Sequence, residues 1–167
     1  MEKSEVLVAL LVQDRLIRFN LQMLETLGKE IRADIEEMDL IAQACLFGEE
    51  LEIYRRALKK IKNELLSSIS EAVEELYDLY EVFNFDITFL STLPEELARD
   101  IERLDVGNSI NSKLQLICHA LEDIIAISEE FCKVRKVLTP MKVYKELIIH
   151  GMEFNKRLYN ISFQKTE

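Results

Sequence analysis

The stretch that decides the fold extends over residues 51–83 and reads LEIYRRALKKIKNELLSSISEAVEELYDLYEVF. Its apolar side chains recur at steps of three or four, in the row Leu51, Tyr54, Leu58, Ile61, Leu65, Ile69, Ala72, Leu76, Leu79 and Phe83. This spacing places them on one face of a helix and leaves charged residues on the opposite face. The stretch therefore predicts an amphipathic helix about 50 Å long.

The residues before this stretch carry the same pattern. Apolar residues between positions 10 and 45 recur at steps of three, four or seven, and the row keeps its phase through Gly28. We therefore predict one long helix from about Ser4 to Phe47, with Gly28 as the place where it can bend. Gly48 predicts the stop of this helix, because glycine readily adopts the left-handed conformation that ends helices.

The helical pattern is interrupted after residue 83. Between Asn84 and Leu93, aromatic and aliphatic residues alternate with polar ones, which predicts an extended connection that packs onto the bundle. A short helix is predicted next, because Thr92 and Glu95 have the spacing of a capping box. Gly107 is expected to end it.

Two further long helices are predicted in the last third of the chain. Asn108 or Ser109 can cap the first of them, whose apolar row spans residues 110–138. Thr139 and Pro140 then predict a stop and a new start, with the threonine as N-cap and the proline at the first helical position.

The composition supports a few long helices over many short elements. Apolar residues make up 49% of the 167 residues, with only 4 glycines and 2 prolines to form turns. Short connections make consecutive helices antiparallel neighbours. We predict a single all-α domain over residues 1–167, an up-and-down bundle of four long antiparallel helices with one short connecting helix.

Charge and apolar content exclude several classes of partner. The net charge of −10 repels nucleic acid and anionic membranes. The longest apolar run, Val6 to Val12, is far shorter than the roughly 20 residues of a membrane span. We therefore predict a cytoplasmic protein with neither nucleic acid nor membrane as a partner.

The same apolar run suggests a function. Because it is apolar on nearly all sides, it is either enclosed at the centre of the bundle or covered by a second subunit. Serine nucleophile elbows and glycine-rich phosphate loops are missing, which lowers the expectation of an enzyme. The leading interpretation is a non-catalytic bundle that acts by self-association, as a homodimer, or by binding another protein, with no cofactor firmly implied.

Three Glu-x-x-x-Asp pairs suggest an alternative. A spacing of four places two carboxylates on one helix face, where they can bind a divalent cation. Long antiparallel helices with such pairs resemble PhoU-like proteins, although the chain lacks the two tandem three-helix repeats of full-length members. The resemblance implies a metal-binding regulator of phosphate uptake, with Glu30, Asp34, Glu74, Asp78, Glu96 and Asp100 as ligands of a divalent metal ion.

A second alternative comes from a different carboxylate spacing. Glu71 and Glu74, followed by Glu102 and Asp105, resemble the magnesium site of MazG-type nucleotide pyrophosphohydrolases. In that family, carboxylates from two helices hold Mg²⁺ on the phosphates of the substrate. The resemblance implies an enzyme that releases pyrophosphate from nucleoside triphosphates.

The two histidines could also contribute to a metal site. The Glu-x-x-His motif of di-iron bundles is absent. If the last hairpin is symmetric about Thr139 and Pro140, His119 and His150 lie ~15 Å apart along the axis and cannot share an ion. The remaining cluster would be His150 with its acidic neighbours Glu129, Glu130, Glu146 and Glu153.

Overall fold

The computed structural model describes residues 3–88, 106–131 and 138–163. Over these ranges the chain forms four helices and no strand: α1 (Lys3–Cys45), α2 (Gly48–Thr88), α4 (Val106–Phe131) and α5 (Leu138–Phe163). The predicted all-α bundle of long helices is therefore confirmed. The short helix predicted to end at Gly107 falls largely within residues 89–105, outside the described part of the chain.

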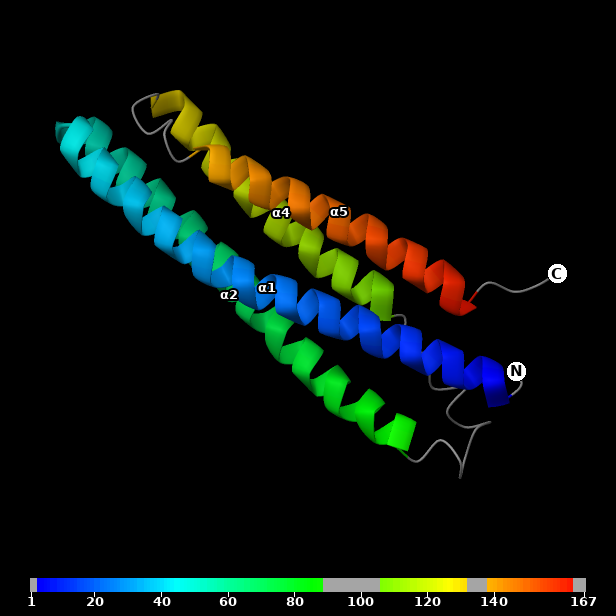
Figure 1. Ribbon diagram of the computed structural model, residues 1–167. Coiled ribbons are helices and arrows are strands. Elements are labelled where there is room, and N and C mark those ends of the chain that lie inside the picture. The colour runs from blue at the N-terminus through cyan, green and yellow to red at the C-terminus, as the bar shows by residue number, and fades with distance from the viewer. Residues whose placement is uncertain (1–2, 89–105, 132–137, 164–167) are drawn as a thin grey trace.

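The four helices pack side by side in the order of the sequence (Figure 1). Helix α1 packs against α2 and α5, and α4 packs against α2 and α5, so that α1 and α4 lie diagonally opposite each other. Helix α1 begins and α5 ends at the same end of the bundle (Figure 1). This is the antiparallel up-and-down arrangement that the short connections predicted.

The predicted apolar rows form the core. Ile31 on α1, Leu65 on α2, Ile117 on α4 and Ile148 on α5 are all fully buried, as are most of their neighbours on the same rows. Helix α1 continues unbroken through Gly28, where an added Cβ would lie 3.3 Å from Ile69 Cγ2. The glycine therefore serves a close approach of α1 and α2 and not a break between two helices.

Three asparagines, the fully buried Asn20 and Asn155 and the half-buried Asn111, form a polar layer that joins α1, α4 and α5. Asn20 Nδ2 donates to Asn155 Oδ1 at 2.7 Å, and Asn155 Nδ2 donates to Asn20 Oδ1 at 3.0 Å. Asn155 Nδ2 also donates to Asn111 Oδ1 at 2.9 Å. Buried amides are stable only when they are paired, so this layer favours one register of the three helices.

The turn between α1 and α2 forms where the sequence predicted it. Helix α1 ends at Cys45, and Leu46 N still donates to Ala42 O at 2.8 Å. Gly48 then has a φ of 60°, a conformation that side chains with a Cβ adopt at a cost. The predicted stop at Gly48 is confirmed.

Replacing Gly48 with alanine is expected to lower the free energy of unfolding by about 1 kcal/mol, because a Cβ strains the left-handed conformation. An added Cβ meets no atom within 4 Å, so the cost is conformational and not a clash. Urea denaturation followed by circular dichroism measures the change. The matched control is Gly48→Asn, which tolerates this conformation better and should lose less stability; equal losses in both variants would contradict this explanation.

Three predicted helix boundaries are wrong. Helix α2 continues through Thr88, so the extended connection predicted from Asn84 does not begin there; neither glycine nor proline interrupts this segment. Helix α4 begins at Val106 and includes Gly107, which the first turn of a helix tolerates. Helix α5 begins at Leu138, so Pro140 lies inside the first turn, where its missing N–H costs nothing.

Candidate functional site

The predicted carboxylate pair of α1 faces α5. Glu30 is exposed, whereas Asp34 is half-buried and accepts a hydrogen bond from the Tyr144 hydroxyl on α5. Burial raises the pKa of Tyr144, and the hydrogen bond to Asp34 raises it further. The hydroxyl therefore stays protonated at neutral pH and continues to donate to Asp34, which links this carboxylate to α5.

The carboxylate pair of α2 lies elsewhere on the bundle. Glu74 and Asp78 are both exposed. Tyr77, next to Asp78, donates to Glu25, which is about 13 Å along α1 from Asp34. The structure therefore does not bring the two pairs together.

The other predicted ligands fall outside the part of the chain that the structure describes. Glu96 and Asp100 of the third pair lie there, as do Glu102 and Asp105 of the MazG-type pattern, whose Glu71 is exposed on α2. Within the described ranges, no group of three or more histidine, cysteine, aspartate or glutamate side chains is arranged to hold a metal ion.

The predicted separation of the two histidines is wrong. Lys145 Nζ on α5 lies 3.1 Å from Glu122 Oε1 on α4, which places His150 at nearly the same level as His119. The hairpin is centred between the end of α4 at residue 131 and the start of α5 at residue 138, and not at Pro140. Both histidines are exposed on their helices.

A row of apolar side chains extends along the outer surface of α5. Val143, Leu147 and Phe154, with the polar His150 between the last two, follow the spacing i, i+4, i+11 and i+7, which places them on one helix face. Val143 and Leu147 retain 48% and 46% of their accessible surface, and Phe154 is half-buried. This row lies beside the core row and does not belong to it.

A matching row on α1 meets it at an aromatic contact. Val8, Val12 and Phe19 have the same spacing, with the exposed and charged Arg15 at the third position, and the rings of Phe19 and Phe154 lie 4.7 Å apart between centroids. The two rows together form an apolar surface that we call the α1–α5 strip, defined by Val8, Val12, Phe19, Val143, Leu147 and Phe154.

The structure also shows how far the N-terminal apolar run is covered. Ala9 is buried, but Val8 and Leu11 remain about half exposed at 52% and 50%. The bundle therefore does not enclose the run on all sides, and its outer side chains extend the apolar surface of α1. The predicted second subunit remains a prediction.

Carboxylates border the strip on both helices. Glu30 and Glu37 lie four residues before and three residues after Asp34, so they share the α1 face that contacts Tyr144. On α5, Glu146 and Glu153 are exposed and adjacent to the apolar row. We call these four glutamates the carboxylate border. The Glu30/Asp34 pair therefore lies beside an apolar surface, which the spacing of the two carboxylates alone did not reveal.

The strip was missed in the sequence because only one apolar row was assigned to each helix. Val143 and Leu147 immediately precede Tyr144 and Ile148, which belong to the core row of α5. The width of the apolar face of α5 could have revealed the strip in the sequence. A surface helix of a bundle needs only one apolar stripe, the one that faces the core. Here the apolar arc of α5 is wider than the core requires, because it includes the exposed Val143 and Leu147.

None of the helices described by the structure is long and apolar enough to cross a membrane. No known family model matches the chain, and no solved structure is similar to it. The chain is 43% identical over 156 residues to a protein of Aquifex aeolicus (strain VF5) described as an uncharacterized protein, and the match covers 93% of both chains. Identity at this level over nearly the whole length shows that the chain belongs to the same protein family as this Aquifex aeolicus protein.

Proposed function

We propose that this protein is a non-catalytic bundle that binds another protein through the α1–α5 strip. The observation that supports this function is the combination of exposed apolar side chains with a carboxylate border. Contiguous apolar surface with a polar rim is typical of protein interaction sites. Because the border is acidic, the partner is expected to carry basic residues beside its own apolar side chains.

The shape of the strip favours a helical partner. Its α5 row, from Val143 to Phe154, is about 16 Å long, which corresponds to three turns of a helix. An amphipathic helix presents apolar side chains at the same spacing and can pack along the seam between α1 and α5. Lysines or arginines flanking its apolar face would pair with the carboxylate border and fix its orientation.

A synthetic leucine–lysine peptide about four helical turns long, with leucines at helical spacing, is the probe for this proposal. Fluorescence anisotropy of the labelled peptide measures its dissociation constant. Val143→Ser with Leu147→Ser is expected to weaken binding by about tenfold, because two apolar contacts are lost. Glu30→Gln with Glu37→Gln should weaken it severalfold and reduce its dependence on salt.

Two controls separate this site from general attraction to an acidic protein. Leu116→Ser changes an exposed apolar residue on α4, away from the strip, and should leave the dissociation constant unchanged. A peptide of the same composition in scrambled order should bind weakly to every variant. Unchanged peptide affinity in the Val143→Ser, Leu147→Ser variant would overturn the proposed function.

A further inference from the structure

Helix α2 carries a second surface, separate from the α1–α5 strip. Exposed polar side chains recur along it at steps of three or four residues, which places them on one face. We call this face the α2 ridge, formed by Arg56, Lys60, Asn63, Ser67, Ser70, Glu74 and Asp78. The core row of the same helix faces the opposite way, so the ridge is the outermost surface of α2.

Beyond its acidic start, which carries Glu49, Glu50 and Glu52, the charges of α2 are divided along its length. Residues 55–62 contain five basic side chains and no acidic one, whereas residues 63–81 contain six acidic side chains and no basic one. Surface helices commonly intersperse the two signs in pairs three or four residues apart. Across the boundary between the two halves only Lys60 and Glu64 are four residues apart, so most of the charge of the two halves has no opposite charge within one helical turn of α2 between them.

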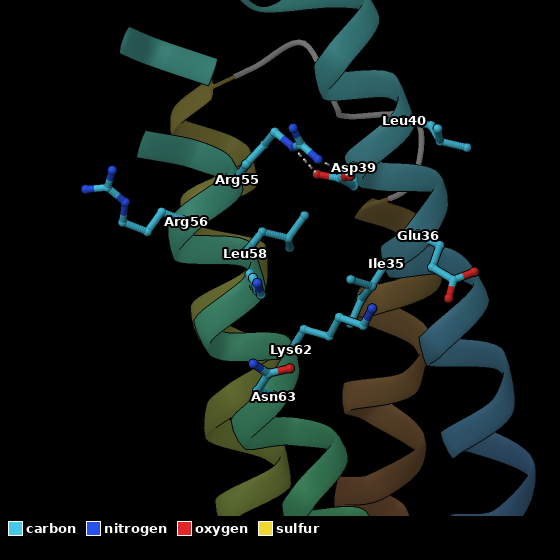
Figure 2. Close-up of a pocket in the computed structure, with 10 residues that line it drawn as sticks. Ile35, Glu36, Asp39, Leu40, Arg55, Arg56, Leu58, Lys62 and Asn63 are labelled. Atoms are coloured by element: carbon cyan, nitrogen blue, oxygen red, sulfur yellow. Dashed lines mark hydrogen bonds and ion pairs between the residues drawn. The ribbon is translucent and has the colours of Figure 1, made fainter. Parts of the chain in front are cut away.

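In the basic half of α2, Arg55 contacts α1, whereas the side chains on the outer face do not. Arg55 faces α1, where its Nε lies 2.9 Å from Asp39 Oδ1, at the edge of a groove of about 800 Å³ (Figure 2). Arg56 also borders this groove but points away from α1 in the same view (Figure 2). Lys60, one turn further along, is exposed on the ridge. The ridge therefore presents its charge to solvent.

We propose that the α2 ridge binds a second copy of this chain, antiparallel, about a twofold axis at Ser67. Arg56 and Asp78 both lie eleven residues from Ser67, and Lys60 and Glu74 both lie seven residues from it. Antiparallel pairing about this residue places Arg56 opposite Asp78 of the partner subunit and Lys60 opposite Glu74 of the partner subunit. The twofold axis makes each pair twice.

The centre of the ridge fits this arrangement. The residue at the axis is Ser67, whose small side chain lets two helices approach closely. Surface ion pairs are individually weak, so the pairs across the ridge mainly fix the register of the two copies.

A second copy is favoured over other occupants because the ridge is its own electrostatic complement. Residues 55–62 would attract a polyanion, but residues 63–81 would repel it. A uniformly basic partner would be attracted by residues 63–81 and repelled by residues 55–62. Both halves of the ridge are matched by a partner that has an acidic segment opposite the basic half and a basic segment opposite the acidic half. A second copy of α2 in the antiparallel direction has this charge distribution. The inference does not depend on the α1–α5 strip, which lies on a different face.

Charge exchange across the ridge tests this interface. Arg56→Glu with Lys60→Glu makes the ridge acidic throughout, and Glu74→Lys with Asp78→Lys makes it basic throughout. Each double variant alone is expected to raise the dimer dissociation constant by at least about tenfold relative to the wild type. Mixed one to one, the two variants should form a heterodimer, measured by sedimentation equilibrium at low salt with one variant carrying a mass tag.

The matched control is Lys156→Glu with Arg157→Glu, which makes the same change in net charge on exposed residues of α5 and should leave the dimer intact. A wild-type chain that stays monomeric up to its solubility limit overturns the proposal, as does a heterodimer that fails to form in the mixture. Binding of the leucine–lysine peptide should persist in both ridge variants. The experiment therefore distinguishes a failure of the proposed dimer interface from a failure of the proposed peptide-binding function of the α1–α5 strip.

Discussion

Replacing Ile31 with alanine is expected to lower the free energy of unfolding by about 3 kcal/mol. Ile31 is fully buried on α1 and belongs to the single core that all four described helices share. The substitution removes three carbon atoms from a close-packed interior, so the loss combines the transfer of apolar surface with the cost of the remaining cavity. Urea denaturation at a fixed protein concentration measures it.

The control for this prediction is an apolar residue of the same bundle that packs little. Leu116 is 60% exposed on α4, and Leu116→Ala should change the free energy of unfolding by no more than about 0.5 kcal/mol. A loss below about 1 kcal/mol for Ile31→Ala would show that its row does not form the centre of the core. A large loss for Leu116→Ala would instead show that this side chain is covered by a partner.

The sequence was sufficient to predict which face of each helix is buried. Ile31, Leu65 and Ile117 were each placed on an apolar row by spacing alone, and each is fully buried. The reason is that periodicity records the side of a helix that faces the core, whatever the neighbouring helix is. The turn at Gly48 was equally local, because a left-handed glycine acts on its own backbone.

The features that failed depend on contacts between distant residues. The level of His150 relative to α4 follows from the hairpin register, which the pair of Lys145 and Glu122 reveals and no local spacing encodes. Asp34 and Tyr144 are 110 positions apart in sequence, so their hydrogen bond had no local signal. For the candidate site, spacing therefore identified carboxylates that share a face, but not the surface beside which that face lies.

Both proposed surfaces share one physical origin. The α1–α5 strip lies beside the core rows and the α2 ridge lies opposite one, and each carries side chains that the bundle itself does not need. Core rows specify the fold, and any residue type that keeps the helix soluble suffices elsewhere. Apolar side chains such as Leu147, and a division of charge such as that of α2, are therefore the features on which we base the two proposed contacts outside the monomer.

Replacing Asn20 with leucine is expected to lower the free energy of unfolding by about 2 kcal/mol. The variant removes one partner of a reciprocal amide pair and leaves Asn155, which is also fully buried, with an unpaired carbonyl oxygen. A buried polar group without a partner costs roughly 1–3 kcal/mol, whereas the leucine itself suits the apolar surroundings. Thermal and urea denaturation of the variant both measure the loss.

The double variant, Asn20→Leu with Asn155→Leu, should recover most of this loss, because replacing both partners by apolar groups of similar shape is nearly neutral. The coupling between the two changes is then about 1–3 kcal/mol, the range for residues in direct contact. Asn111 keeps its hydrogen bond to Met152 O at 3.1 Å, but its Oδ1 loses the donor Asn155 Nδ2, so the recovery is not complete. Losses that simply add would show that the amide pair does not form.

If the pair does form, its removal should reduce the specificity of packing more than the stability. In the double variant, α1 and α5 lose the contact that fixes their register. The amide resonances of both helices should therefore broaden in the NMR spectrum of the double variant, although its stability is restored.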